Sequence, residues 1–350
     1  MKKREETYKT KKPESFHTTF GEGGIMKKCI LFLIVLCLTI HYGHCLSIAA
    51  GPDYPTKPIT MMVGYAAGGG TDLGARMIAK FAKEDVGQEI IIANKPGAGG
   101  VVAMTLLSKA DPDGYTLCAA TDTSVVFSPH TTPVGYKPLE DFIFISQYGV
   151  LHTGLAVLAE SPLRSFKDLH EFAKKNPDKL TIGTVGKGGG SQVILEALAK
   201  IDGLKIKIVP FRGASPAMTA LLGGHVLAVS CAGSGYAPHV KSGKVRLLAV
   251  FSEERMEQHP KVPTLNELGY STLVFESWYL ISAPKNTDKA IVKKLEESFR
   301  KAMDTPDFIK FAKHIEVYKK KTLSGDELKN ALIRKNTNNE SLLKQLGMVK

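Results

Sequence analysis

Short apolar runs alternate along this chain with amphipathic stretches, and glycine-rich segments separate many of them. The first unit shows the order most clearly. Residues 59–63 indicate a strand, residues 65–72 a turn, and residues 73–85 a helix whose apolar side chains fall on one face. Strands that alternate with helices in this way are typical of α/β layers around a mainly parallel sheet. The pattern therefore predicts an α/β protein.

Two series of such units follow one another and predict two lobes of similar size, which suits a length of 350 residues. The expected strands lie at residues 59–63, 89–93, 115–120, 154–158, 179–184, 205–209, 225–230, 245–251 and 276–283. The expected helices lie at residues 73–85, 101–110, 165–176, 192–201 and 216–222, with a helical C-terminus that a capping box at 324–327 opens. We assign residues 51–152 and 275–350 to lobe 1 and residues 153–274 to lobe 2, joined by two crossover segments near 151–154 and 273–277.

The N-terminal 50 residues have the pattern of an export signal. Residues 29–40 are apolar, two lysines precede them, and small residues follow. Twelve apolar residues are fewer than the roughly 20 that span a bilayer. We therefore predict a signal peptide that starts near Met26 and is cleaved near Ala49 and Ala50, which places the protein in the periplasm. An uncleaved anchor and a lipid anchor at Cys45 stay open as alternatives.

The charge of the chain indicates which binding partners to expect, and its cysteines indicate which disulfide is possible. The whole chain carries a net charge of +12, and residues 1–50 hold 8 basic and 4 acidic residues, so +8 remains without them. A mildly basic protein favours anionic partners. The basic residues at 285–321 are interleaved with acids at helical spacing, which indicates a solvated helix face, and we expect no nucleic-acid partner. After the leader only Cys118 and Cys231 remain, and a disulfide between them stays open.

Three glycine-rich turns, at residues 68–72, 97–100 and 186–191, each stand between a predicted strand and a predicted helix. A helix N-terminus exposes unpaired backbone N–H groups and a partial positive charge, and glycine lets a ligand approach that backbone closely. One such turn is equally well explained as a tight connection. Three of them, at the same end of their sheets and distributed over two lobes, favour a shared site for a carboxylate or phosphate.

Nucleotide-binding and catalytic signatures fail on spacing. In the third turn Ser191 stands where a dinucleotide fingerprint needs its last glycine, and no Gly-Lys pair of the two lobes is followed by Ser or Thr as in a P-loop. Residues 189–193 begin like a nucleophile elbow but end in valine. The histidines are scattered, and no H-E-x-x-H occurs. We therefore expect no catalytic residue, no metal and no cofactor.

A set of short motifs runs through the chain after the leader. They are Tyr54-Pro55-Thr56-Lys57-Pro58-Ile59, Gly68-Gly69-Gly70-Thr71-Asp72, Asn94-Lys95-Pro96-Gly97-Ala98-Gly99-Gly100, Asp111-Pro112-Asp113-Gly114-Tyr115, Val209-Pro210-Phe211-Arg212-Gly213 and Ala220-Leu221-Leu222-Gly223-Gly224. With these motifs the chain, from about Tyr54 to its C-terminus, resembles the periplasmic substrate receptors of tripartite tricarboxylate transporters, the Bug-type binding proteins. The resemblance implies a two-lobed type II periplasmic-binding-protein fold with a cleft that closes around its ligand.

The resemblance also implies which residues bind the ligand. In the family, two turns of lobe 1 hold one carboxylate, which points here to Tyr65, Ala67, Gly68, Thr71, Asp72, Ala98, Gly99 and Gly100. We add the strand end at Thr121 and Thr123, and from lobe 2 we expect Thr184, Gly188, Ser191, Gln192 and Cys231. The chain departs from the family pattern at Ala67, at residues 192–194 and at residues 227–228. The contacts to the far end of the ligand, and with them the identity of the acid, are therefore not fixed.

Two charged residues need separate interpretations. Asp72 would repel an anion at close range, so we expect it to stabilise the start of its helix, with a water-mediated ligand contact as the alternative. Arg212 fits two roles equally well. It can pair bidentately with a ligand carboxylate or with an acidic residue of the protein.

Together these observations predict a monomeric extracytoplasmic solute receptor for a small di- or tricarboxylate-like acid, which it delivers to membrane transporter subunits. A ligand sensor for a membrane signalling partner is the main alternative. An exported α/β enzyme would need an activated nucleophile or an acid–base pair, and the pattern shows neither.

Overall fold

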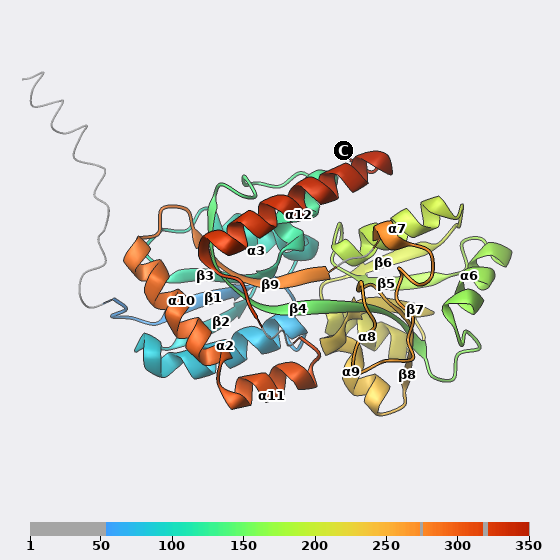
Figure 1. Cartoon of the computed structure of the whole chain (residues 1–350), viewed down its shortest axis with the longest axis horizontal. Helices are drawn as coiled ribbons and strands as arrows, with labels where there is room; N and C mark the ends of the chain where they lie inside the picture. Colours follow the sequence, from blue (N-terminus) through green and yellow to red (C-terminus); the bar gives the residue numbers. More distant parts are fainter. Residues whose placement is uncertain (1–53, 274–275, 318–320, 350) are drawn as a thin grey trace, which may run out of the picture. The chain divides into compact units, whose positions relative to one another are not determined.

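The computed structural model describes residues 54–273, 276–317 and 321–349 (Figure 1). The predicted signal peptide, its cleavage near Ala49 and Ala50, and the alternative anchor at Cys45 lie outside these residues. Within the described part of the chain, no helix has the length and apolar character that a membrane span requires.

Lobe 1 is built on a mixed sheet with the strand order β2-β1-β3-β9-β4. The strands are β1 (Ile59–Val63), β2 (Ile90–Asn94), β3 (Thr116–Thr121), β4 (Phe142–Leu158) and β9 (Glu276–Pro284). β1 runs parallel to β2 and β3, whereas β9 is antiparallel to both β3 and β4. The carboxyl ends of β1 and β3 therefore point the same way, toward the second lobe.

Lobe 2 continues from the second half of β4 into β7, β5 and β6. These strands are β5 (Thr181–Val185), β6 (Lys207–Phe211) and β7 (Ala228–Ala232), and β8 (Val245–Val250) pairs with the other edge of β4. β5 is parallel to β6 and β7, but β4 is antiparallel to β7 and β8. The expectation of a mainly parallel sheet is thus wrong, because the strands that connect the lobes return against the direction of the α/β units.

The first crossover is a strand rather than a linker. Residues 142–152 of β4 pair with β9 in lobe 1, and residues 153–158 pair with β7 and β8 in lobe 2. The strand predicted at 154–158 is therefore only the end of a 17-residue strand. The second predicted crossover includes residues 274–275, outside the described residues, and β9 begins directly after them. The lobe boundaries at residues 152 and 274 remain a proposal.

Helices cover both faces of the two sheets (Figure 1). They are α2 (Gly70–Val86), α3 (Val101–Leu107), α4 (Thr123–Val126), α5 (Ser128–Thr131), α6 (Phe166–Lys175), α7 (Gly190–Ile201), α8 (Ala214–Leu222), α9 (Gly233–Lys241), α10 (Lys289–Met303), α11 (Pro306–His314) and α12 (Gly325–Gln345), with 3-10 turns at Ala98–Gly100 and Ser271–Leu273. The sequence pattern misses α4, α5 and α9. The predicted capping box at α12 does not form, because the Ser324 hydroxyl donates to Glu296 (2.6 Å) instead of capping the helix.

The apolar faces of the helices pack on the sheets, and this packing holds the helices in position. In lobe 1, Ile78 of α2 and Phe299 of α10 share one core cluster with Ile59 and Val63 of β1. In lobe 2, α8 and α9 pack on β7 and β8 in a second cluster. A third cluster lies under α3, α6, α7 and α12. β1, β5, β6 and β7 each lead through a short turn into a helix, so the N-termini of α2, α7, α8 and α9 gather at the strand ends between the lobes.

Candidate functional site

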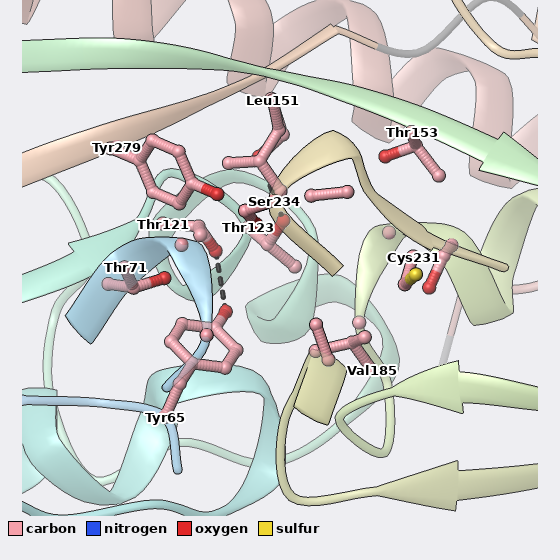
Figure 2. A pocket seen from close by; sticks show the side chains of 18 residues that line it. Tyr65, Thr71, Thr121, Thr123, Leu151, Thr153, Val185, Cys231, Ser234 and Tyr279 are labelled. Atoms are coloured by element: carbon pink, nitrogen blue, oxygen red, sulfur yellow. Dashed lines mark hydrogen bonds between the residues drawn. The ribbon is translucent and has the colours of Figure 1, made fainter. Parts of the chain in front are cut away.

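A small cavity of about 50 Å³ lies between the two lobes, with the crossing strands β4 and β9 as part of its wall (Figure 2). It is lined by Tyr65, Gly69, Gly70, Thr71, Thr121, Thr123, Leu151, Thr153, Val185, Gly189, Gly190, Ser191, Ala214, Cys231, Ala232, Ser234, Ser277 and Tyr279. None of these residues carries a formal charge at neutral pH. Among the described residues, the lining thus consists of backbone, hydroxyl groups and a few apolar side chains.

Four helices begin at this cavity without a side-chain cap. α2, α7 and α8 follow glycine at their N-cap positions, α9 follows Ala232, and the first residues of each line the cavity. Of the longer helices that begin elsewhere, α6, α10 and α11 are capped by Ser165, Asp288 and Thr305, and α12 is not capped. Uncapped N-termini leave N–H groups unpaired and concentrate partial positive charge. Four of them around one cavity make a site for an anion that needs no cationic side chain.

Hydroxyl groups complete the lining, and two of them are phenols. The Tyr65 hydroxyl donates to the Gly99 carbonyl (2.8 Å) and shares a hydrogen bond with Thr121 Oγ1 (2.6 Å), which ties the first two glycine turns to the end of β3 (Figure 2). Burial raises the pKa of both Tyr65 and Tyr279. Both phenols therefore keep their protons at neutral pH, and Tyr279 presents a neutral donor to the cavity.

A buried ion pair between Asp122 and Lys335 lies next to the hydroxyl groups of the cavity. Asp122 stands between Thr121 and Thr123 and is completely buried. Its carboxylate accepts hydrogen bonds from Ser277 Oγ and from the backbone N–H of Trp278 (2.9 Å), and Lys335 of α12 lies 2.8 Å from its second oxygen. Asp122 thus holds Ser277 directly and is the chain neighbour of Thr121 and Thr123, and the C-terminal helix supplies the charge that permits its burial.

Asp72, predicted to stabilise its helix, lies outside the cavity lining and is buried beside it. Its carboxylate accepts hydrogen bonds from the Gly68 N–H (3.0 Å), Arg76 Nε (3.0 Å) and Asn94 Nδ2 (2.8 Å). Burial acts to raise the pKa of Asp72, but the hydrogen bonds from Arg76, Gly68 and Asn94 outweigh it and lower the pKa overall. These contacts support the expected structural role, since every one of them holds the first glycine turn in place.

The substitution Asp72→Asn should destabilise the protein by about 1–3 kcal/mol, because an amide nitrogen would face donors that now meet a carboxylate. A lowered folded-state pKa adds stability above the unfolded pKa, and this stability is lost as the pH falls through the folded value. Melting temperatures between pH 3 and 7 check both points. The difference between wild type and variant should shrink below about pH 4, and a difference independent of pH would contradict this account of Asp72.

The lobes meet in a seam beside the cavity, so this structure is a closed form. The Ala66 N–H of lobe 1 donates to the Arg212 carbonyl of lobe 2 (3.1 Å), and Ser128 Oγ donates to the Gly188 carbonyl (3.3 Å). The backbone of Gly186 lies directly against that of Gly99, close enough that a side chain on Gly186 would collide. Glycine in these turns therefore serves lobe-to-lobe contact as well as any ligand contact.

The residues predicted as ligand contacts divide into two groups. Tyr65, Thr71, Thr121, Thr123, Ser191 and Cys231 are brought together around the cavity. Ala67, Gly68, Asp72, Ala98, Gly99, Gly100, Thr184, Gly188, Gln192 and Arg212 are not part of its lining. Gln192 instead accepts from the Gly188 N–H (3.0 Å), and Arg212 is exposed and lines a separate hollow of about 380 Å³ with Ala98 and Gly99.

The pattern missed several lining residues, two of them on segments that were not predicted as helix or strand and two on a strand that was predicted. Ser234 is in α9, Thr153 is in the middle of β4, and Ser277 and Tyr279 are on β9. The run Gly233-Ser234-Gly235 was a usable signal, since it follows a strand as the other glycine turns do. Cys118 and Cys231 are both free and buried, so the disulfide left open is absent. Among the described residues no three His, Cys, Asp or Glu side chains gather as a metal ion requires.

Comparison with known proteins shows which family this chain is similar to. The family described as Tripartite tricarboxylate transporter family receptor matches residues 74–348. The UPF0065 protein in the gbd 5' region of Cupriavidus necator is 40% identical over 260 residues, which are 74% of this chain and 79% of that protein.

Two solved structures agree with the fold. The periplasmic binding protein BugD matches with a TM-score of 0.80 and 29% identity, over 85% of this chain and 100% of that chain. MatC from Rhodopseudomonas palustris with bound malate matches with a TM-score of 0.76 and 26% identity, over 83% of this chain and 100% of that chain. The predicted two-lobed periplasmic-binding-protein fold is confirmed.

Proposed function

This chain belongs to the tripartite tricarboxylate transporter receptor family, and from that premise we propose that it binds a small organic carboxylate in the cavity between its lobes and releases it unchanged. The observation that carries the proposal is the set of four uncapped helix N-termini around one uncharged cavity. A carboxylate would accept hydrogen bonds from these N–H groups and from the lining hydroxyls, and it would replace the caps that the helices lack.

The cavity size favours a short acid. At about 50 Å³ in this closed form, the cavity is well below the roughly 150 Å³ that holds a benzene molecule. Its walls must therefore move apart to admit any organic acid, and a short acid requires the smallest movement. The related MatC structure contains malate, a four-carbon dicarboxylate. We therefore propose a short dicarboxylate or hydroxy acid as the ligand, with one carboxylate at the lobe-1 helix α2 and the other end of the molecule at α7 and α9 in lobe 2.

The lining does not favour chemistry on the bound acid. Cys231 is its one thiol, and burial raises the pKa of that thiol to about 12. A thiol that stays protonated is a poor nucleophile. Within the described residues the cavity is lined by no carboxylate, histidine or lysine that could act as a general acid or base. We propose a receptor role without catalysis.

We further propose that the protein is exported to the periplasm by its N-terminal segment, which is removed near Ala49 and Ala50. There it would act as a monomer and deliver its ligand to the membrane subunits of a transporter. This proposal rests on the apolar run at residues 29–40 and on membership of the receptor family.

Thermal-shift titration of refolded, ligand-free protein tests carboxylate binding. A cognate acid at 100 times its Kd should stabilise the closed form by about 2.7 kcal/mol and raise the Tm by several degrees. Malate, succinate, adipate and citrate form the panel, and the corresponding diamides serve as uncharged controls. The proposal fails if no organic acid raises the Tm, or if the diamides raise it equally. NMR of the recovered ligand should show it unchanged.

A further inference from the structure

One acidic side chain joins the two lobes just outside the cavity lining. Glu316 follows α11 in lobe 1, is only 7% exposed, and adopts a left-handed backbone conformation with φ 57° that few residues other than glycine adopt. Its Oε1 lies 2.8 Å from Nε2 of His259, which belongs to the segment after β8 in lobe 2. The His259 side chain is 13% exposed, so the pair is shielded from solvent on both sides.

Glu316 also faces the first turn of a lobe-2 helix. A Cβ added to Gly233, the first residue of α9, would lie 2.7 Å from Cβ of Glu316 and 2.9 Å from its Oε2. The absence of a side chain at Gly233 therefore lets the carboxylate approach the start of α9. That helix has no side-chain cap, and a negative charge near its N-terminus is favourable.

The same turn of α9 faces the ligand cavity on its other side. Ser234 lines the cavity beside Tyr279 (Figure 2). Both of their hydroxyl oxygens lie so close to Gly70 of α2 that a Cβ there would be 2.3 Å from each. The start of α9 is thus held between two parts of lobe 1, α2 on the cavity side and Glu316 on the far side.

The pair lies next to the strand that crosses between the lobes. Val317, the residue after Glu316, accepts a hydrogen bond from the Val150 N–H of β4 (3.2 Å). Tyr236 of α9 donates to the His152 carbonyl of β4 (3.2 Å), and its ring centroid lies 6.0 Å from that of His259. A change in the angle between the lobes would therefore displace Glu316 relative to His259 and α9.

We propose that Glu316 and His259 form an interlobe brace that positions α9 in the closed form and slows ligand release. This inference rests on the proposed carboxylate-binding function. Glu316 touches no ligand in this scheme. It acts through α9, which carries one of the four N-termini and the Ser234 hydroxyl to the cavity. The brace favours the closed arrangement and leaves the encounter with ligand in the open form unaffected.

Stopped-flow kinetics with malate, or with the acid of largest thermal shift, tests the brace. Trp278, the single tryptophan of the chain, lies on the crossing strand β9 and serves as the fluorescent probe. The substitution Glu316→Ala should raise koff roughly tenfold with little change in kon, as truncation of one partner of a buried hydrogen-bonded pair does at interfaces. Glu316→Gln keeps a hydrogen bond to His259 and should recover part of this effect.

Two comparisons separate a brace from a merely structural role. In a double-mutant cycle, His259→Ala should add little to Glu316→Ala, because each removes the same interaction. The control Glu267→Ala removes an exposed ion pair with Arg255 within lobe 2 (2.8 Å) and should leave koff unchanged. An unchanged koff in Glu316→Ala, or a fall in Tm of the ligand-free protein without a kinetic effect, would overturn the proposal.

A ligand-free measurement keeps the brace testable even if no carboxylate binds. Spin labels on cysteines introduced at the exposed positions Lys80 of α2 and Lys241 of α9 report the distance between the lobes. Glu316→Ala should shift the distance distribution from its wild-type form toward more open conformers. Distributions that coincide in wild type and variant would reject the brace, whereas absence of any carboxylate binding by the wild type would reject the proposed function instead.

Discussion

Replacement of Gly186 by alanine should abolish high-affinity ligand binding while both lobes remain folded. A Cβ at this position would lie 2.6 Å from Cα and 2.7 Å from the backbone nitrogen of Gly99 in the opposite lobe. Backbone atoms cannot turn aside as a flexible side chain can, so the lobes must separate. We expect ligand affinity to fall on the order of 100-fold, equivalent to about 2.7 kcal/mol, because the contacts from the two lobes can no longer be made together.

Gly224→Ala is the matched control for Gly186→Ala. Both glycines are in lobe 2 and have similar left-handed conformations, with φ 78° at Gly186 and φ 71° at Gly224. A Cβ on Gly224 would meet nothing within 4 Å. Each variant should lose about 1 kcal/mol of stability from the left-handed backbone alone, but only Gly186→Ala should lose binding in calorimetric titration. Equal affinities in the two variants would show that the seam does not limit closure.

The position of the glycine turns could be predicted from the sequence because it depends only on neighbouring residues. A strand, a glycine run and an amphipathic helix follow one another at residues 59–85, and in an α/β layer that order fixes where the helix N-terminus lies. The family resemblance then pointed to individual residues of these turns. The structure places Thr71 and Ser191 in the cavity lining, and Gly68 and Gly188 one residue before the lining residues Gly69 and Gly189.

Elements with weak propensity escaped prediction. The first half of β4 contains Ser146, Gln147 and Gly149, and its polar positions interrupt the apolar alternation that marks a strand. α9 opens with Gly233-Ser234-Gly235 and contains Pro238, which are poor helix formers. Tertiary packing against β7 and β8 stabilises this helix, and no local pattern reports such packing. Sequence reasoning therefore missed Ser234 and Thr153.

Ion pairs between residues far apart in the sequence could not be predicted, for a different reason. Asp122 follows a strand end in the sequence and has the pattern of a turn residue, while Lys335 is one of three lysines on the C-terminal helix α12. Nothing local distinguishes Lys335 from the exposed Lys344 on the same helix. Only the fold brings Lys335 to Asp122, whose carboxylate is buried behind the cavity hydroxyls.

This pairing leads to the second prediction, that Lys335→Met should destabilise the protein by about 3–5 kcal/mol. Asp122 is completely buried, and Lys335 is the cation that the structure pairs with it at 2.8 Å. Loss of the lysine leaves a carboxylate uncompensated in the interior, where an unpaired charge is strongly unfavourable. Urea denaturation of wild type and variant measures the free energy of unfolding. Ligand affinity should fall as well, because Asp122 holds Ser277 at the cavity and is the chain neighbour of Thr121 and Thr123.

Lys344→Met on the same helix is the control for charge removal. Lys344 pairs with Glu340 at 2.6 Å on an exposed face, and such a pair contributes about 0.3–0.5 kcal/mol. The double variant Asp122→Asn with Lys335→Met should recover part of the stability lost in Lys335→Met, since no charge is then left buried. A loss in Lys335→Met no greater than in Lys344→Met would mean that Asp122 does not need α12. In that case the C-terminal helix would have no part in positioning the cavity hydroxyls.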